Sequence, residues 1–82
     1  MAKKKIDITN ASFKEIFQYL KNEYSECEIN EIDGLKIIFK DSSWVHLRKS
    51  NTEEIIRIYS EADDTLKANQ IADKVISLVN SL

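Results

Sequence analysis

The sequence predicts an α+β fold, a two-layer sandwich in which two helices cover one face of a mostly antiparallel sheet. Two segments of the 82 residues repeat apolar side chains at three- and four-residue steps, which is typical of amphipathic helices. Other short segments alternate apolar and polar residues, which is typical of strands with one buried face. The predicted element order is β-α-β-β-β-β-α, and a chain of this length is expected to form a single domain, residues 1–82.

The first two elements are a strand and a capped helix. Ile6 and Ile8 alternate with polar residues and predict a short strand. The lysines at 3–5 before it are interpreted as a solvated chain end, or as a remnant of where the chain was cut or fused. Ser12 and Glu15 have the spacing of a capping box, so a helix is predicted over 12–24. Its apolar face consists of Phe13, Ile16, Phe17, Leu20 and Tyr24.

A hairpin is predicted next, because the pair Asp33 and Gly34 suits the two positive φ angles of a type I′ turn. The outgoing strand, 35–40, places Leu35, Ile37 and Phe39 on one face. A second turn is predicted at 41–43, where an aspartate precedes two serines.

Two further strands and a final helix complete the fold. In the strand 44–48 and the strand 55–61, alternation places Arg48 and Arg57 on the same face, away from the core. The final helix is predicted to begin near Asp63, Asp64 or Thr65. Its apolar stripe consists of Ala68, Ile71, Ala72, Val75, Leu78, Val79 and Leu82.

Composition restricts the classes of function. The chain is 43% hydrophobic and 32% charged, and it has no apolar run long enough to span a bilayer, so a soluble protein without a membrane partner is expected. The net charge of −2 argues against a general nucleic-acid binder, which needs an excess of cations. Cys27 is the only cysteine, which excludes an internal disulfide and a cysteine-based zinc site and fits a cytoplasmic location.

The side chains that could bind a ligand are concentrated in the loop after the strand 44–48. Arginine presents a planar fork that matches two phosphate oxygens, and Arg48 and Arg57 flank this loop. Ser50 and Thr52 supply hydroxyl groups, and Asn51 tolerates the left-handed backbone of a tight loop. These residues predict a local phosphate-binding site.

Other interpretations of these residues remain open. The segment Ser50 to Glu53 is also typical of an ordinary turn, in which Arg48 pairs with Glu53 or Glu54 at the surface. His46 has no partner spacing that indicates a triad or a metal site, so a structural or solvated role is favoured. Trp44 and Tyr59 on the outer face favour packing between domains over stacking on bases.

The segment 44–62, W-V-H-L-R-K-S-N-T-E-E-I-I-R-I-Y-S-E-A, resembles the signature of the fourth, C-terminal domain of the α-D-phosphohexomutases, R-x-S-[G/N]-T-E-P with a following arginine. The similarity extends to D-G-L-K-I-I-F before it and to the A-D-D-x-x-x-A helix after it. The resemblance implies a TATA-box-binding-protein-like fold and a phosphosugar ligand. It assigns phosphate binding to Arg48, Ser50, Asn51 and Thr52, with supporting roles for Lys49, Glu53 and Arg57.

The sequence departs from the family pattern at two positions. Lys49 stands where the family often has proline, and Glu54 replaces the proline that closes the motif. Proline fixes φ and restricts the unfolded chain, so Glu54 predicts a looser loop and adds a negative charge near an anion site.

The resemblance also implies what lies outside this chain. No segment resembles the family's phosphorylated serine loop or its D-x-D-x-D magnesium loop, so no catalytic residue, metal ligand or cofactor is expected in this chain. Magnesium is expected in the other domains of the parent phosphoglucomutase or phosphomannomutase, which would be this domain's partners. We expect an excised domain, inactive alone, that clamps a phosphate and closes the cleft. The alternative is a stand-alone phosphate-binding or interaction module.

Overall fold

The computed structural model describes residues 1–7, 12–50 and 54–81. It contains five strands and two helices in the predicted order. These elements are β1 (Ala2–Asp7), α1 (Phe13–Glu23), β2 (Glu28–Asn30), β3 (Leu35–Ile38), β4 (Trp44–Lys49), β5 (Ile55–Glu61) and α2 (Thr65–Asn80). No helix in this described part is both long and apolar enough to cross a membrane.

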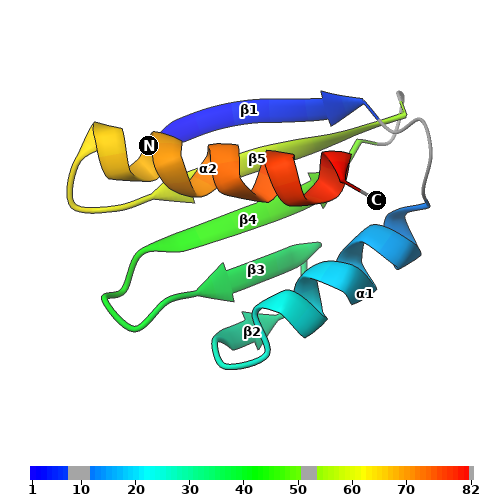
Figure 1. The fold of residues 1–82 in the computed structure, drawn as a ribbon, viewed down its shortest axis with the longest axis horizontal. Coiled ribbons are helices and arrows are strands. Elements are labelled where there is room, and N and C mark those ends of the chain that lie inside the picture. Colours follow the sequence, from blue (N-terminus) through cyan, green and yellow to red (C-terminus); the bar gives the residue numbers. More distant parts are fainter. Residues whose placement is uncertain (8–11, 51–53, 82) are drawn as a thin grey trace.

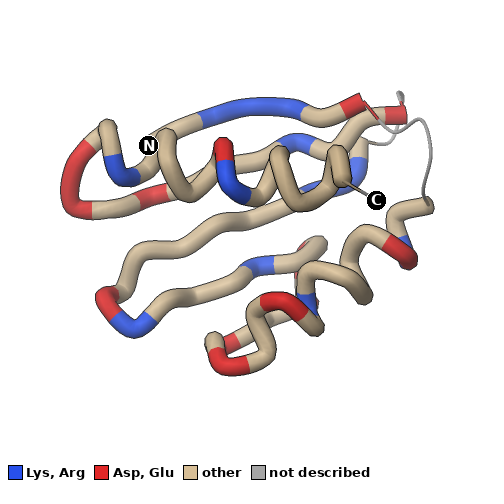
Figure 2. Tube along the Cα trace, viewed as in Figure 1, with Lys and Arg blue, Asp and Glu red and all other residues tan. Residues whose placement is uncertain are grey.

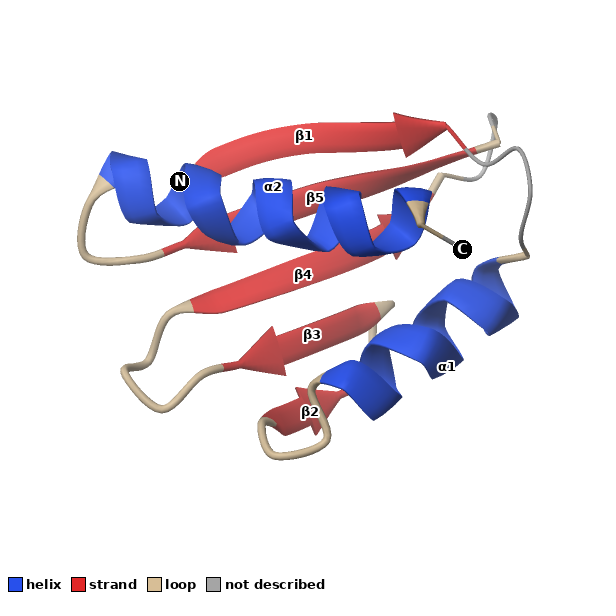
Figure 3. Cartoon of the chain, viewed as in Figure 1, coloured by secondary structure: helices blue, strands red, loops and turns tan. Residues whose placement is uncertain are grey.

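The strands form one sheet in the order β1-β5-β4-β3-β2, and each neighbouring pair is antiparallel. Both helices lie on the same face, with α2 across β1, β5 and β4 and α1 beside β3 and β2 (Figures 1 and 3). The predicted α+β two-layer arrangement is therefore confirmed. No described element covers the opposite face, which we call the open face.

The core lies between the helices and the inward-facing residues of the sheet. These residues come from alternate positions of every long strand, as the hydrophobic pattern predicts. The fully buried side chains include Ile16, Leu20, Leu35, Ile37, Val45, Leu47, Ile56, Ile58 and Val75. Ser60 is also fully buried, and its hydroxyl donates to the carbonyl of Ala68 at 2.6 Å, which joins β5 to α2.

Local capping signals determine where both helices begin. The Ser12 hydroxyl accepts from the amide of Glu15 at 3.2 Å, which confirms the predicted start of α1. In α2 the Asp64 carboxylate accepts from the amide of Lys67 at 2.7 Å, so Asp64 is the N-cap among the three candidates. Two predicted members of the first strand and the last helix, Ile8 and Leu82, lie outside the described residues.

The predicted two-residue type I′ turn at Asp33 and Gly34 is wrong. Pairing in this hairpin ends at Asn30 and Lys36, and the Asn30 side chain accepts from the amide of Ile32 at 2.9 Å, which lengthens the connection. Of the two residues only Gly34 has a positive φ, 83°. Any side chain there would also collide with β4, because a Cβ would lie 2.2 Å from the carbonyl oxygen of Leu47.

The lysines at 3–5 lie in the middle of β1 and not before it as predicted, although Lys3 and Lys5 are exposed to solvent. They pair with 57–59 of β5. The turn between β3 and β4 is confirmed, and it shortens β3 to Ile38 because the amide of Ser42 already donates to the carbonyl of Phe39 at 3.0 Å. Asp41 stabilises this turn by accepting from the amide of Ser43 at 3.0 Å.

Candidate functional site

The candidate site lies on the open face, where β4 ends and β5 begins, next to the loop that connects them. Arg48 and Arg57 are directly paired across the two strands and both are exposed. Their side chains share the face opposite the core, as strand alternation predicts, because their neighbours Leu47 and Ile58 are fully buried. Two arginine side chains therefore leave the sheet from paired positions on the same face, next to the loop.

The two ends of the loop are joined by a backbone hydrogen bond, since the amide of Ser50 donates to the carbonyl of Ile55 at 3.2 Å. Ser50 itself is half-buried. Asn51, Thr52 and Glu53, three of the site residues that the sequence predicts, lie outside the described residues. The structure consequently places four of the seven predicted residues, namely Arg48, Lys49, Ser50 and Arg57.

Lys49 belongs to the other side of the sheet. It pairs with the buried Ile56, so its side chain leaves β4 toward the helices, and its Nζ lies 4.7 Å from the centre of the Phe13 ring at the start of α1. The structure thus does not bring Lys49 together with Arg48 and Arg57. A cation over an aromatic ring connects the loop to α1.

Among the described residues, Arg48 pairs with Asp33, a partner that the sequence did not indicate. Asp33 Oδ2 lies 3.4 Å from Arg48 Nη2, and the two side chains are 67% and 51% exposed. The Asp33 carbonyl also accepts a hydrogen bond from Nε2 of His46. The turn between β2 and β3 therefore folds onto the open face of β4, and Asp33 rather than Glu54 competes with any anion for Arg48.

The open face carries more positive charge than the loop alone. Lys3 and Lys5 of β1 point to this face opposite Tyr59 and Arg57, and Lys36 of β3 lies 4.6 Å from the Trp44 ring centre. Figure 2 shows this charge along β1 and at the ends of β4 and β5. The row of cations across β1, β5 and β4 is thus a local feature of a chain whose net charge is −2.

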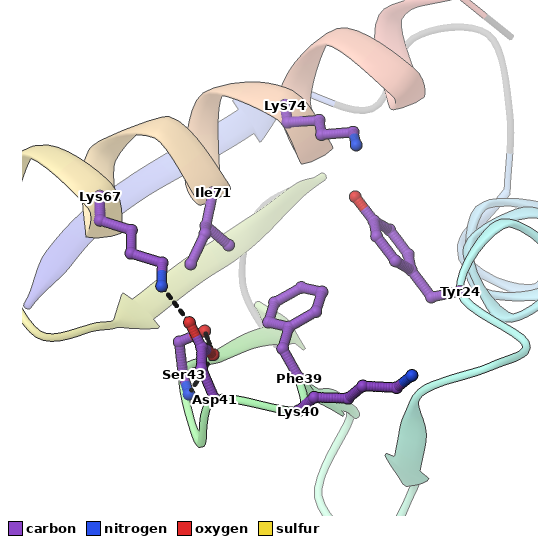
Figure 4. Close-up of a pocket in the computed structure, with 8 residues that line it drawn as sticks. All are labelled: Tyr24, Phe39, Lys40, Asp41, Ser43, Lys67, Ile71 and Lys74. Carbon is purple, nitrogen blue, oxygen red and sulfur yellow. Dashed lines mark hydrogen bonds and ion pairs between the residues drawn. The ribbon is translucent and has the colours of Figure 1, made fainter.

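The helix-covered side has a cavity of about 460 Å³ between α1, α2 and the turn after β3. Figure 4 shows Tyr24, Phe39 and Ile71 around it, with lysines at its rim. Lys67 pairs with Asp41, and this hydrogen bond, followed by those from Ser43, lowers the pKa of the Asp41 carboxyl well below its ordinary value. Burial raises the pKa of the Tyr24 phenol, so it stays protonated at neutral pH.

Metal binding finds no support in the described residues, where no three His, Cys, Asp or Glu side chains lie together in a way that would hold an ion. The chemistry that the open face can perform is the binding of an anion. Its donors are guanidinium, ammonium and hydroxyl groups, and the carboxylates of Asp7, Glu28 and Glu61 share the face with that of Asp33.

Comparison with known proteins identifies relatives of the chain. Residues 2–78 match the family model described as phosphoglucomutase/phosphomannomutase, C-terminal domain. A probable phosphoglucosamine mutase of Methanobrevibacter smithii is 41% identical over 61 residues, which are 73% of this chain and 14% of that protein. A phosphomannomutase of Methanocaldococcus jannaschii is 33% identical, over 84% of this chain and 15% of its own length.

A third relative, a phosphoglucosamine/phosphogalactosamine mutase of Sulfurisphaera tokodaii, is 38% identical over 82 residues, which cover 96% of this chain and 18% of that protein. The chain therefore spans less than a fifth of the length of each of these three relatives.

Proposed function

This chain belongs to the family of phosphoglucomutase/phosphomannomutase C-terminal domains, and on that premise we propose that it binds the phosphate group of a phosphosugar and closes the active-site cleft of a longer mutase. The reaction of that enzyme would move a phosphate between the 1- and 6-positions of a hexose. Because the chain corresponds to less than a fifth of its relatives, the other domains would supply the chemistry. The chain alone is expected to be inactive.

The observation that carries this proposal is the cross-strand pair of Arg48 and Arg57 on the open face. Like charges directly opposite each other in a sheet are unfavourable, so this arrangement weakens the fold unless an anion lies between them. A phosphate dianion can accept hydrogen bonds from both guanidinium groups. The pair therefore favours binding over a structural role.

The loop between the two arginines would complete the site. Family resemblance assigns Ser50, Asn51 and Thr52 to the phosphate, and the Ser50–Ile55 hydrogen bond supports this by holding the ends of the loop together. Lys49 and Glu53 would act as supporting residues, with the contact of Lys49 to Phe13 fixing the loop against α1. Closure over the cleft would then follow from the engagement of this loop by bound substrate.

Magnesium, which family resemblance leads us to expect in the other domains, has no role in the step proposed for this chain. The described side chains offer no cluster suited to a metal ion. The proposed contribution of the chain is electrostatic and positional: it holds the phosphate that is not being transferred.

The test is a titration of the isotopically labelled chain with glucose 1-phosphate, monitored through the NMR shifts of the backbone amides. A chloride titration at matched ionic strength is the control. Saturable shifts at Arg48–Ser50 and Glu54–Arg57 are expected. Arg48→Ala removes a two-pronged cation that is half exposed, so affinity should fall about tenfold, equivalent to about 1.4 kcal/mol.

The matched control is Lys40→Ala, which removes an exposed cation at the opposite end of β4, in the turn after β3. Its affinity should equal that of the unaltered chain. Equal affinities of Arg48→Ala and Lys40→Ala would disprove the assigned role of Arg48.

A further inference from the structure

A small hollow on the open face lies beside the proposed phosphate loop, at the strand that begins the chain. Its volume is about 300 Å³, and it is lined by Lys3, Lys4, Lys5, Arg57 and Tyr59. Lys3 and Lys5 come from β1, and their cross-strand partners are Tyr59 and Arg57 of β5. The four side chains that face the hollow thus occupy the corners of a rectangle of about 5 Å by 7 Å, set by strand spacing and by the two-residue repeat.

The cations that face this hollow make no ion pair with the described residues, and the acidic residues on the same face, Asp7 and Glu61, lie two positions further along β1 and β5. Lys3, Lys5 and Arg57 are exposed, and none of them has an ion pair or hydrogen bond from its side chain in residues 1–7, 12–50 and 54–81. Lys5, Arg57 and Arg48 form a row of like charges across three adjacent strands. Each like-charge neighbour opposes folding, so the row is poorly explained by stability alone.

An anion at the Arg48 loop does not remove this imbalance. Arg48 and Lys5 are separated by two strand spacings, roughly 10 Å between backbones, which is about one Debye length at physiological salt. Lys3 lies a further two residues along β1. An anion bound at the Arg48 loop would therefore leave the positive charge at the β1 end of the row largely unchanged.

We propose that Lys3, Lys5, Arg57 and Tyr59 form a second anion subsite, which takes the dianion of a soluble phosphate monoester. Three cations and a phenol hydroxyl around a hollow of this size match a compact, doubly charged, tetrahedral group. The subsite goes beyond the phosphate loop: the two share Arg57, but the subsite does not require Arg48 or the loop residues.

Two other roles of these residues compete with this proposal. Lysines on an edge strand such as β1 discourage other chains from extending the sheet. Aromatic and basic side chains on an open sheet also occur in single-strand nucleic-acid binders. The half burial of Tyr59 and Trp44 and the overall negative charge favour a small anion over a polyanion.

The experiment titrates the labelled chain with inorganic phosphate at constant ionic strength, with chloride as the control, and follows amide shifts of β1 and β5. The unaltered chain and Arg48→Ala should both show saturable shifts at 3–5 and 57–59, because the subsite does not need Arg48. The double variant Lys3→Gln/Lys5→Gln should bind phosphate about fivefold more weakly at these amides. The matched double variant Lys14→Gln/Lys74→Gln removes two exposed lysines from the helices and should behave like the unaltered chain.

Three results would overturn the subsite. Shifts limited to Arg48–Ser50 and Glu54–Arg57 would leave only the loop site. An unchanged affinity in Lys3→Gln/Lys5→Gln, with new aggregation, would assign these lysines to edge protection. Tighter binding of single-stranded oligothymidylate than of phosphate, with shifts spreading to Trp44 and His46, would assign the face to nucleic acid. Loss of loop shifts in Arg48→Ala with retained β1 shifts would separate the subsite from the proposed function.

Discussion

The three consecutive lysines of β1 lie in two different electrostatic environments, one on each face of the sheet. On the helix-covered face, Lys4 Nζ lies 2.5 Å from Asp73 Oδ1 on α2, and Lys67 of α2 pairs with Asp41 in the turn after β3 (Figure 4). On the open face, Lys3 and Lys5 have no acidic partner in the described part of the chain. Neighbouring residues of one strand thus differ in how their charge is balanced.

This difference separates cations that support packing from cations that are available to a ligand. The ion pairs of the helix-covered side connect α2 to the strand and to the turn on which it rests. The open face instead accumulates Lys5, Arg57 and Arg48 in one row, with Asp33 as a partner for Arg48 only. Side chains selected only for stability would not keep such a row, since like charges opposite each other oppose folding.

The largest expected effect compares the two faces of a single strand, β5. Ile58→Ala removes a fully buried side chain from the helix-covered face and should reduce the free energy of unfolding by about 2–5 kcal/mol, because it leaves a cavity. Arg57→Ala, at the neighbouring position on the open face, should change it by at most about 0.5 kcal/mol while weakening phosphate binding. Urea denaturation and phosphate titration of both variants measure this contrast. A loss of stability in Arg57→Ala that matches Ile58→Ala would show that the open face is structural.

The fold was predictable because its signals are local. Ser12 and the acidic residues before α2 mark the starts of the helices, and alternation assigns Leu47 and Ile58 to the core and Arg48 and Arg57 to the other face. The hairpin at Gly34 was only half predicted. The glycine requirement was recognised, but the Asn30 side chain that lengthens the turn competes with a two-residue connection and has no comparably strong sequence signal.

The candidate site was less predictable, because its composition depends on which strands are neighbours. The motif from Arg48 to Arg57 is contiguous and was found, but Lys3 and Lys5 join it only because β1 pairs with β5. Asp33 reaches Arg48 only because the turn at Gly34 packs on β4. The pairing of strands that are distant in sequence therefore determines which side chains are neighbours on the open face. The periodicity within one strand does not reveal that pairing.

A smaller effect concerns Asp33, the acidic residue that pairs with Arg48 in the described part of the chain. Asp33→Asn removes the carboxylate beside Arg48 and keeps the backbone carbonyl that accepts from His46. Affinity for phosphate should rise about two- to fivefold, since an exposed ion pair contributes up to about 1 kcal/mol and no longer competes with the ligand. Glu31→Gln is the matched control. It removes a carboxylate from the same turn, but this carboxylate pairs with Lys21 and not with Arg48. Equal affinities of the two variants would mean that Asp33 does not compete for Arg48.

The smallest effect tests the helix-covered side through pH. The pKa of Asp41 is lowered in the folded chain, first by the hydrogen bond from Lys67 and then by those from Ser43. A carboxyl with a lowered folded pKa contributes its full stability above its unfolded pKa, about 3.9, and loses that contribution as the pH falls further. The pKa of Lys67 is raised, so its contribution is complete below about pH 10 and constant over the acidic range.

The stability difference between the unaltered chain and Asp41→Asn should therefore be constant from pH 7 to pH 5 and shrink between pH 4 and pH 2.5, as measured by urea denaturation at each pH. Lys67→Gln should remove most of this pH dependence, because its hydrogen bond is the first cause of the shift. Lys5→Gln, which removes a cation of the open face, should leave the dependence intact. A dependence that disappears in Lys5→Gln as well would mean that the charges of the two faces are not independent, and that the cations facing the open side also support the packing of α2.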